Sequence, residues 1–461
     1  MSRGKELAKN TIIMLVGKIA TQFLSFLLLP LYTHLLPKDD YGVVDLISSY
    51  VSIAIPVATL QLEMAAFRFL IDARKKPEKQ AMIIRTAFSD LFKRILIVAI
   101  LYLITAQFVD FNYKYYALFA ALSIGLSNVM LQISRGLGKN LVYTIAAVIT
   151  AGTTIVSNLI LICVLHKGAE SILISMSVAN IVCTCFLFIK LKIYSHLKQS
   201  SSSTELSKKM VKYSTPLVPN SISWWLISSS DRTIVTAILG AAANGTYAIA
   251  CKFPSIVSGF IGVFSYSWTE SASLHIEDED RDKYFSSVAG NALRLFSSIG
   301  IGVIAFLPMV FNIIVGEEYR DSYNYIPIAI LAVVLNSIVL AYSAIYVAKK
   351  LTKKVASTSI ASAIINIIVD LALIKIIGLY SAVISTAVAY LIMAVYRHID
   401  VRKYVKIKYS IKDLMLAIMA IVTVSFCYYS SNKYLLAAGI AIAIIYAIAQ
   451  NLNLFKKILK R

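Results

Sequence analysis

The sequence predicts an all-α membrane protein with about 14 transmembrane helices, on three observations. Hydrophobic residues make up 58% of the 461 residues and the mean hydropathy is +0.75, which no soluble globular class matches. The chain divides into apolar segments, most of which reach the roughly 20 residues that a bilayer core requires. Of the 45 lysine and arginine residues, 35 lie on the predicted inner side, which comprises the two ends of the chain and the connections after even-numbered spans, 6 lie in the other connections and 4 lie within spans. This charge asymmetry predicts a multi-pass protein of the bacterial inner membrane with both termini in the cytoplasm.

Each span must be helical, because an open strand would leave backbone groups unpaired in lipid. The third span and the last two are short, so their ends are the least well defined. In chain order, the predicted spans are residues 11–35, 43–70, 95–109, 115–134, 141–165, 171–189, 214–239, 245–269, 295–315, 325–348, 355–374, 380–396, 414–429 and 435–449.

The longest polar break, residues 190–213, separates the first six spans from the rest. Residues 36–42 (LPKDDYG) and 239–247 (LGAAANGTY) stand at corresponding places in the two halves. Because six is an even number, two copies would share their orientation in the membrane, as in transporters built from parallel repeats. We expect an N-lobe at 1–193, a cytoplasmic linker at 194–213, a C-lobe at 214–403, and two last spans with a basic tail at 404–461.

Composition excludes several function classes. The pI near 9.6 comes from basic residues on short connections, which set the topology and favour anionic lipids, so we expect no nucleic-acid partner. All five cysteines lie in apolar spans, where they are typical small core residues and predict no metal site. The outer connections are too short for a catalytic domain. We therefore expect no enzyme, no catalytic residues and no cofactor, apart from H⁺ or Na⁺ as a candidate coupling ion.

Six ionisable residues lie well inside the spans, on polar stripes at helical spacing. Small and hydroxylated residues on such stripes can serve helix packing alone. A charge at mid-span costs at least ~2.5–3.5 kcal/mol, so the ionisable residues predict a hydrated, charged cavity. They are Lys18, Glu63, Asp231, Arg232, Lys252 and Asp370.

The cations and the acids in this set have different predicted roles. Lys18, Arg232 and Lys252 are candidate substrate-binding residues, because guanidinium and ammonium groups bind phosphate. The acids either neutralise these cations or take up H⁺ or Na⁺. Asp370 is the favoured coupling residue, because no basic residue shares its stripe, and Glu63 comes next. Asp231, next to Arg232, is expected to pair with it.

Three segments resemble the polysaccharide flippase (Wzx-type) family. The most specific is residues 213–235 (YSTPLVPNSISWWLISSSDRTIV), which cover most of the seventh span, and the others are 29–42 (LPLYTHLLPKDDYG) and 245–254 (GTYAIACKFP). The resemblance implies the fold of the multidrug/oligosaccharidyl-lipid/polysaccharide exporter superfamily, with two six-helix lobes in a V around a central cavity and two further C-terminal helices. It also implies movement of undecaprenyl-diphosphate-linked oligosaccharide repeat units from the inner to the outer leaflet, for O-antigen or capsule assembly.

As partners, the resemblance implies membrane lipids, a polysaccharide polymerase and a chain-length regulator. Two alternatives from the same superfamily stay open, a lipid II flippase and a multidrug antiporter. Antiporters of cationic drugs need an acidic, aromatic pocket, against which the basic intramembrane residues argue. A third alternative is a membrane-embedded polysaccharide polymerase or ligase, which would need a large basic outer loop.

Overall fold

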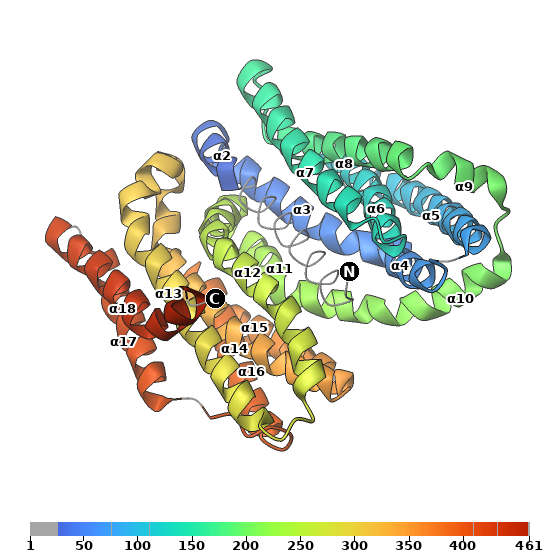
Figure 1. The fold of residues 1–461 in the computed structure, drawn as a ribbon. Coiled ribbons are helices and arrows are strands. Elements are labelled where there is room, and N and C mark those ends of the chain that lie inside the picture. The colour runs from blue at the N-terminus through green and yellow to red at the C-terminus, as the bar shows by residue number, and fades with distance from the viewer. Residues whose placement is uncertain (1–25, 75, 110, 409, 431, 460–461) are drawn as a thin grey trace. The chain divides into compact units, whose positions relative to one another are not determined.

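The computed structural model describes residues 26–74, 76–109, 111–408, 410–430 and 432–459, and within these ranges it contains helices and no strand (Figure 1). Lys18 and most of the first predicted span lie outside the described residues. The chain forms two compact units. The first unit holds residues up to Leu36 and Val43–Trp225, and the second holds Pro37–Gly42 and Leu226–Arg461.

The first unit is built on one apolar core that α4, α5, α6, α8 and α10 share, with Leu62, Ile84, Ile133, Leu187 and Met210 all buried. Met210 belongs to the polar linker, so one face of the linker helix α10 packs on this unit. In chain order the elements are α2 (Leu29–Leu35), α3 (Lys38–Thr59, whose first residues up to Gly42 belong to the second unit), α4 (Leu62–Asp72), α5 (Pro77–Thr105), α6 (Lys114–Gly136), α7 (Asn140–Asn158), the π-helix η1 (Leu159–Val164), α8 (Glu170–Lys190), α9 (Ile193–Gln199), α10 (Thr204–Ser214), η2 (Thr215–Leu217) and the start of α11 (Val218–Leu239).

The second unit is centred on α14, which packs against both α12 and α16, while α15 covers α16. The last two helices, α17 and α18, pack against α13 and against each other. This unit continues α11 and then has α12 (Ala241–His275), α13 (Arg281–Ile314), the 3₁₀ segment η3 (Glu317–Tyr325), α14 (Ile326–Ala348), α15 (Thr352–Ile377), α16 (Tyr380–Val401), α17 (Ile411–Tyr428) and α18 (Lys433–Leu459).

Ten helices among the described residues are long and apolar enough to cross a membrane. The predicted all-α, multi-pass membrane fold is therefore confirmed, while the count of fourteen stays a prediction. Three of the other predicted spans are also helical, in α5, α11 and α17. Helix α5 carries Asp90, Lys93 and Arg94, and α11 carries Asp231 and Arg232, so both have charged residues within the helix.

The second predicted span is not one helix but two, α3 and α4. Leu60 and Gln61 separate them with φ values of 51° and 57°, the left-handed region that residues other than glycine rarely adopt. The amide of Gln61 donates to the carbonyl of Pro56 at 3.1 Å, which ends α3. The side-chain amide of Gln61 donates to the hydroxyl of Ser221 at 2.5 Å. The break places Glu63 in the first turn of α4, where a carboxylate interacts favourably with the helix dipole.

Candidate functional site

A buried polar network in the second unit surrounds the carboxylate of Asp231. Its Oδ2 accepts hydrogen bonds from the hydroxyl of Tyr247 on α12 and from that of Thr386 on α16, both at 2.9 Å. With the amide of Asn366 oriented so that both of its atoms have partners, its nitrogen donates to Asp231 Oδ1 at 2.9 Å. Asp231 is only 2% exposed, and charge buried to this degree is stable only when it is hydrogen-bonded or paired.

Asp370 lies on α15 one helical turn after Asn366 and is fully buried. Its Oδ1 accepts a hydrogen bond from the Ser381 hydroxyl at 2.6 Å, and its Oδ2 has no partner among the residues that the structure describes. Asn366, one turn before Asp370 on α15, donates to Asp231, so the two carboxylates belong to the same buried network. Two like charges in a low-dielectric interior are costly, so this arrangement favours taking up a proton or a small cation.

The ligands that the network offers are carboxylate, amide and hydroxyl oxygens, the types that hard cations prefer. No group of three His, Cys, Asp or Glu residues suited to a metal ion occurs in the described part of the chain. With two carboxylates instead of three or more, the network fits a singly charged ion better than a divalent one.

A cavity of about 290 Å³ adjoins the network and is lined by Asp231, Arg232, Tyr247, Thr386 and Tyr390, among others. Arg232 donates from Nη1 to the carbonyl of Ser228 at 3.0 Å, and its guanidinium lies 5.9 Å from the centre of the Tyr247 ring. A guanidinium and a carboxylate therefore face the same space. The guanidinium can bind an anion there, while the carboxylate is held by its own hydrogen bonds.

The other predicted site residues lie elsewhere. Lys252 is on α12 between cavity-lining neighbours, but it does not itself line the cavity. Its ammonium has no hydrogen bond or ion pair with the described residues. Glu63 belongs to the first unit, is 8% exposed and accepts a hydrogen bond from Thr59 at 3.0 Å. Lys18 lies outside the described residues. Of the six ionisable residues that the sequence predicts for the cavity, the structure therefore brings together three, Arg232, Asp231 and Asp370.

Sequence reasoning missed the neutral partners of Asp231 and one buried cation. Tyr247 and Thr386 carry no charge, and hydropathy does not distinguish them from packing residues. Arg397 follows the predicted end of span 12 and was therefore expected in a connection, but α16 continues to Val401 and Arg397 is 1% exposed. For the partners of Asp231 the sequence offered one signal, which is that Asn366 lies four residues before Asp370 and therefore on the same face of the predicted span 355–374.

Arg397 is held entirely by neutral groups. Its guanidinium donates to Thr358 Oγ1 at 2.7 and 3.0 Å, to Ser359 Oγ at 3.2 Å and to the hydroxyl of Ser343. It also donates to the carbonyl of Val339 at 3.2 Å. No carboxylate hydrogen-bonds to it among the described residues. Because these groups come from α14 and α15, Arg397 joins three helices and does not face the cavity beside Asp231.

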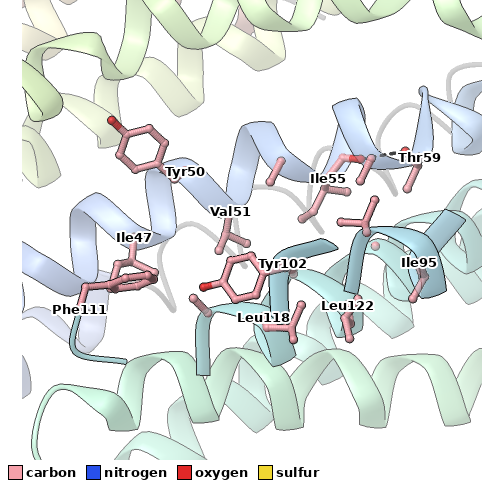
Figure 2. A pocket seen from close by; sticks show the side chains of 16 residues that line it. Ile47, Tyr50, Val51, Ile55, Thr59, Ile95, Tyr102, Phe111, Leu118 and Leu122 are labelled. Carbon is pink, nitrogen blue, oxygen red and sulfur yellow. Dashed lines mark hydrogen bonds between the residues drawn. The ribbon is translucent and has the colours of Figure 1, made fainter. Parts of the chain in front are cut away.

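The first unit has a cavity of a different kind, shown in Figure 2, with a volume of about 260 Å³ between α3, α5 and α6. Its lining is almost wholly apolar. The hydroxyl of Tyr102 donates to the carbonyl of Lys114 at 2.9 Å, and that of Thr59 donates to Ile55 O at 3.0 Å, so both groups already use their donor within the protein. An engineered apolar cavity of about 150 Å³ stays dry and binds benzene. This cavity therefore suits an apolar chain and offers a sugar few hydrogen-bonding groups.

Comparison with known proteins adds a family and a fold. A family model described as "Polysaccharide biosynthesis protein" matches residues 7–269, more than half of the chain. Among solved structures, the lipid II flippase MurJ in an inward closed conformation has a TM-score of 0.69 at 15% identity, covering 98% of this chain and 100% of that chain.

Two multidrug transporters are also similar. An inward-facing MATE family transporter has a TM-score of 0.65 at 16% identity, covering 86% of this chain and 94% of that chain. A MATE transporter of Vibrio cholerae has a TM-score of 0.58 at 14% identity, covering 87% of this chain and 96% of that chain. No curated protein matches the sequence. At these identities the structural likeness establishes the fold alone, which is that of the MurJ and MATE transporters.

Proposed function

Because this chain belongs to the polysaccharide biosynthesis protein family, we propose that it is a flippase that moves undecaprenyl-diphosphate-linked oligosaccharide units to the outer leaflet of the inner membrane. The products would serve O-antigen or capsule assembly. Family membership and the transporter fold support transport without covalent chemistry. A polysaccharide polymerase and a chain-length regulator are the proposed partners that use the translocated units.

The observation that carries this proposal is the cation that faces the cavity of the second unit. Arg232 lines the cavity and has a planar guanidinium with several donors, of which Nη1 contacts Ser228 O. A guanidinium binds phosphate through two parallel hydrogen bonds, and binding is stronger where water is excluded. We assign the diphosphate of the substrate to Arg232, with Lys252 and Lys18 as further candidate cations.

The cycle proceeds by alternating access, with the isoprenoid tail remaining in lipid. A diphosphate bound at Arg232 brings negative charge close to Asp231 and Asp370. Uptake of H⁺ or Na⁺ by the two acids would offset this repulsion, so ion binding and substrate binding would be linked. We propose these two acids as the coupling site, and Glu63 as a lesser candidate because its position in the first turn of α4 gives it a structural role.

A lipid II flippase is the second candidate, favoured by the similarity to MurJ over 98% of this chain. Lipid II would present the same diphosphate to Arg232 and would differ only in its sugar part. A multidrug antiporter for cationic compounds is less favoured, because a guanidinium in the cavity repels cations.

Deleting the gene tests the proposal. We expect lipid-linked oligosaccharide to accumulate on the cytoplasmic face, detected with a membrane-impermeant glycan label on intact cells and on opened vesicles, together with loss of surface polymer. The composition of the accumulated glycan then separates a repeat unit from lipid II. Single units accumulating on the outer face would overturn the proposal in favour of a polymerase or ligase.

A further inference from the structure

The largest of the three described cavities lies in the first unit, outside both sites above. Its volume is about 380 Å³, and it is formed where the end of α4, the start of α5 and the start of the linker helix α10 meet. Hydrogen bonds fix α10 in this position. The amide of Ser203 donates to Thr86 Oγ1 at 3.1 Å, and the hydroxyl of Ser207 donates to Asp90 at 2.5 Å. The cavity is therefore part of the folded unit.

The charges around this cavity leave a positive excess. Glu205 pairs with Lys209 at 2.6 Å, and this contact holds the pKa of Glu205 below its ordinary value, so Glu205 is ionised at neutral pH. Asp72 pairs with Arg68 at 2.7 Å.

Both carboxylates that line the cavity are thus neutralised by their own partners. Two further lining residues, Lys76 and Lys79, have no acidic partner among the described residues. The cavity accordingly presents two uncompensated ammonium groups.

The rest of the lining is apolar, with Phe69, Met82, Ile83 and Leu206 beside the lysines. Met82 is 39% exposed, so an apolar side chain is open to a ligand beside the two lysines. All the lining residues lie at the ends of spans or in connections that the charge asymmetry predicts to be cytoplasmic. Basic pockets between transmembrane helices on this side bind anionic lipid headgroups.

We propose that this cavity binds the phosphodiester headgroup of an anionic membrane phospholipid. Lys76 and Lys79 contact the phosphate, and the apolar lining contacts the glycerol and the first carbons of the acyl chains. Since α10 belongs to the segment that links the two halves of the chain, the bound lipid stabilises the packing of this linker on α4 and α5. This binding does not depend on which substrate the protein transports.

The test is lipid titration of the purified full-length protein in detergent, followed by native mass spectrometry. The ligand is phosphatidylglycerol, with phosphatidylcholine as the neutral comparison. The double variant Lys76→Gln/Lys79→Gln should weaken phosphatidylglycerol binding about 30-fold, as expected for the loss of two basic contacts to a headgroup. The matched control Lys208→Gln/Lys212→Gln removes the same charge from α10 outside the cavity and should change the affinity less than threefold.

Equal weakening by the two double variants would overturn the proposal, because binding would then depend on net charge alone. Equal affinity for phosphatidylcholine would also overturn it. Displacement of phosphatidylglycerol by millimolar inorganic phosphate would show that the site binds a free anion instead of a lipid. If the double variant does not purify as a monodisperse protein, Lys79→Gln alone provides the same comparison with Lys208→Gln.

Discussion

The amide nitrogen of Asn366 lies 2.9 Å from Oδ1 of Asp231 and thereby connects α15 to α11 inside the second unit. The carbonyl oxygen of the same amide accepts from the backbone of Thr386 on α16 at 3.2 Å. One side chain thus joins three helices around a carboxylate. A proton or cation bound at Asp231 would change what Asn366 can donate or accept, and with it the packing of α11, α15 and α16. This is the physical basis on which ion uptake could be linked to helix movement.

The first prediction concerns the two acids. Asp370→Asn replaces one of the two carboxylates of the network by a neutral amide. The remaining carboxylate, Asp231, no longer has a like charge in the same network, so binding of a proton or cation is no longer needed to offset repulsion. We expect a folded protein whose transport, in vesicles loaded with substrate, no longer depends on the H⁺ or Na⁺ gradient. Thermal unfolding provides a second readout, because an ion that binds the native state raises its free energy of unfolding by RT ln(1 + [L]/Kd). We expect the ion to raise the unfolding temperature of the unchanged protein and not that of Asp370→Asn.

The matched control for this prediction is Glu63→Gln. Glu63 is a buried carboxylate of the first unit that accepts a hydrogen bond from Thr59 and lies in the first turn of α4. These contacts give it a structural role, so the dependence of transport on the ion gradient should persist in this variant. Unchanged gradient sensitivity in Asp370→Asn, or its loss in Glu63→Gln alone, would move the coupling site away from Asp370.

The second prediction concerns the cation of the cavity. Arg232→Ala should reduce surface polysaccharide at least tenfold while leaving membrane insertion intact, because a phosphate loses a charge-assisted contact. Arg232→Lys keeps the charge but loses the paired geometry, so we expect partial activity. Lys252→Ala should also reduce export. Surface polymer is measured by immunoblot, and insertion by the amount of protein in washed membranes.

Wild-type polymer levels in both alanine variants would argue against a cationic substrate site. A loss of the protein itself from the membrane would instead indicate that Arg232 stabilises the fold through Ser228 and Tyr247. Restored export in Arg232→Lys would then distinguish a charge requirement from a packing requirement.

Sequence reasoning predicted the all-α fold, because hydropathy and charge asymmetry depend on composition over about 20 residues and not on individual contacts. It also singled out Asp231, Arg232 and Asp370, since a charge within a span is rare, and their roles stay a prediction. It could not find the break at Leu60 and Gln61. Neither residue is a glycine, and the left-handed turn depends on tertiary contacts such as that of Gln61 with Ser221.

The extent of α16 shows the same limit. Hydropathy ends the span at residue 396, just before Arg397, because an arginine next to other polar residues is typical of a cytoplasmic connection. The neutral oxygens that receive its guanidinium come from residues 38 to 58 positions away. Such long-range pairing is not visible in local sequence.

The third prediction follows from these contacts. Arg397→Ala removes several hydrogen bonds from a charged donor, each worth about 1.5–3 kcal/mol, and leaves a void where α14, α15 and α16 meet. We expect a large drop in the unfolding temperature and in membrane abundance. Arg397→Lys should recover only part of the loss, because an ammonium cannot reach all these acceptors. An unchanged unfolding temperature in Arg397→Ala would show that the contacts add nothing to stability.

The fourth prediction concerns a glycine contact in the second unit. A Cβ on Gly42, in the first turns of α3, would collide with the carbonyl of Ala241 and the amide of Gly245 at the start of α12. The side chain of Asn244 donates to the carbonyl of Gly42 at 2.7 Å, which holds the two backbones together. Backbones this close require glycine at both positions, and residues 36–42 and 239–247 are the segments that correspond in the two halves of the sequence.

Gly42→Ala or Gly245→Ala should therefore push the first turn of α3 away from the start of α12 and destabilise the protein by about 1–3 kcal/mol, the usual cost of overpacking. The matched control is Gly290→Ala in α13, where an added Cβ meets nothing within 4 Å. That change should stabilise the protein by about 0.5–1 kcal/mol, because alanine favours a helix over glycine. Thermal unfolding of the three purified variants measures both effects. Equal stability of Gly42→Ala and Gly290→Ala would contradict this prediction, because the contact between Gly42 and the start of α12 would then loosen without cost.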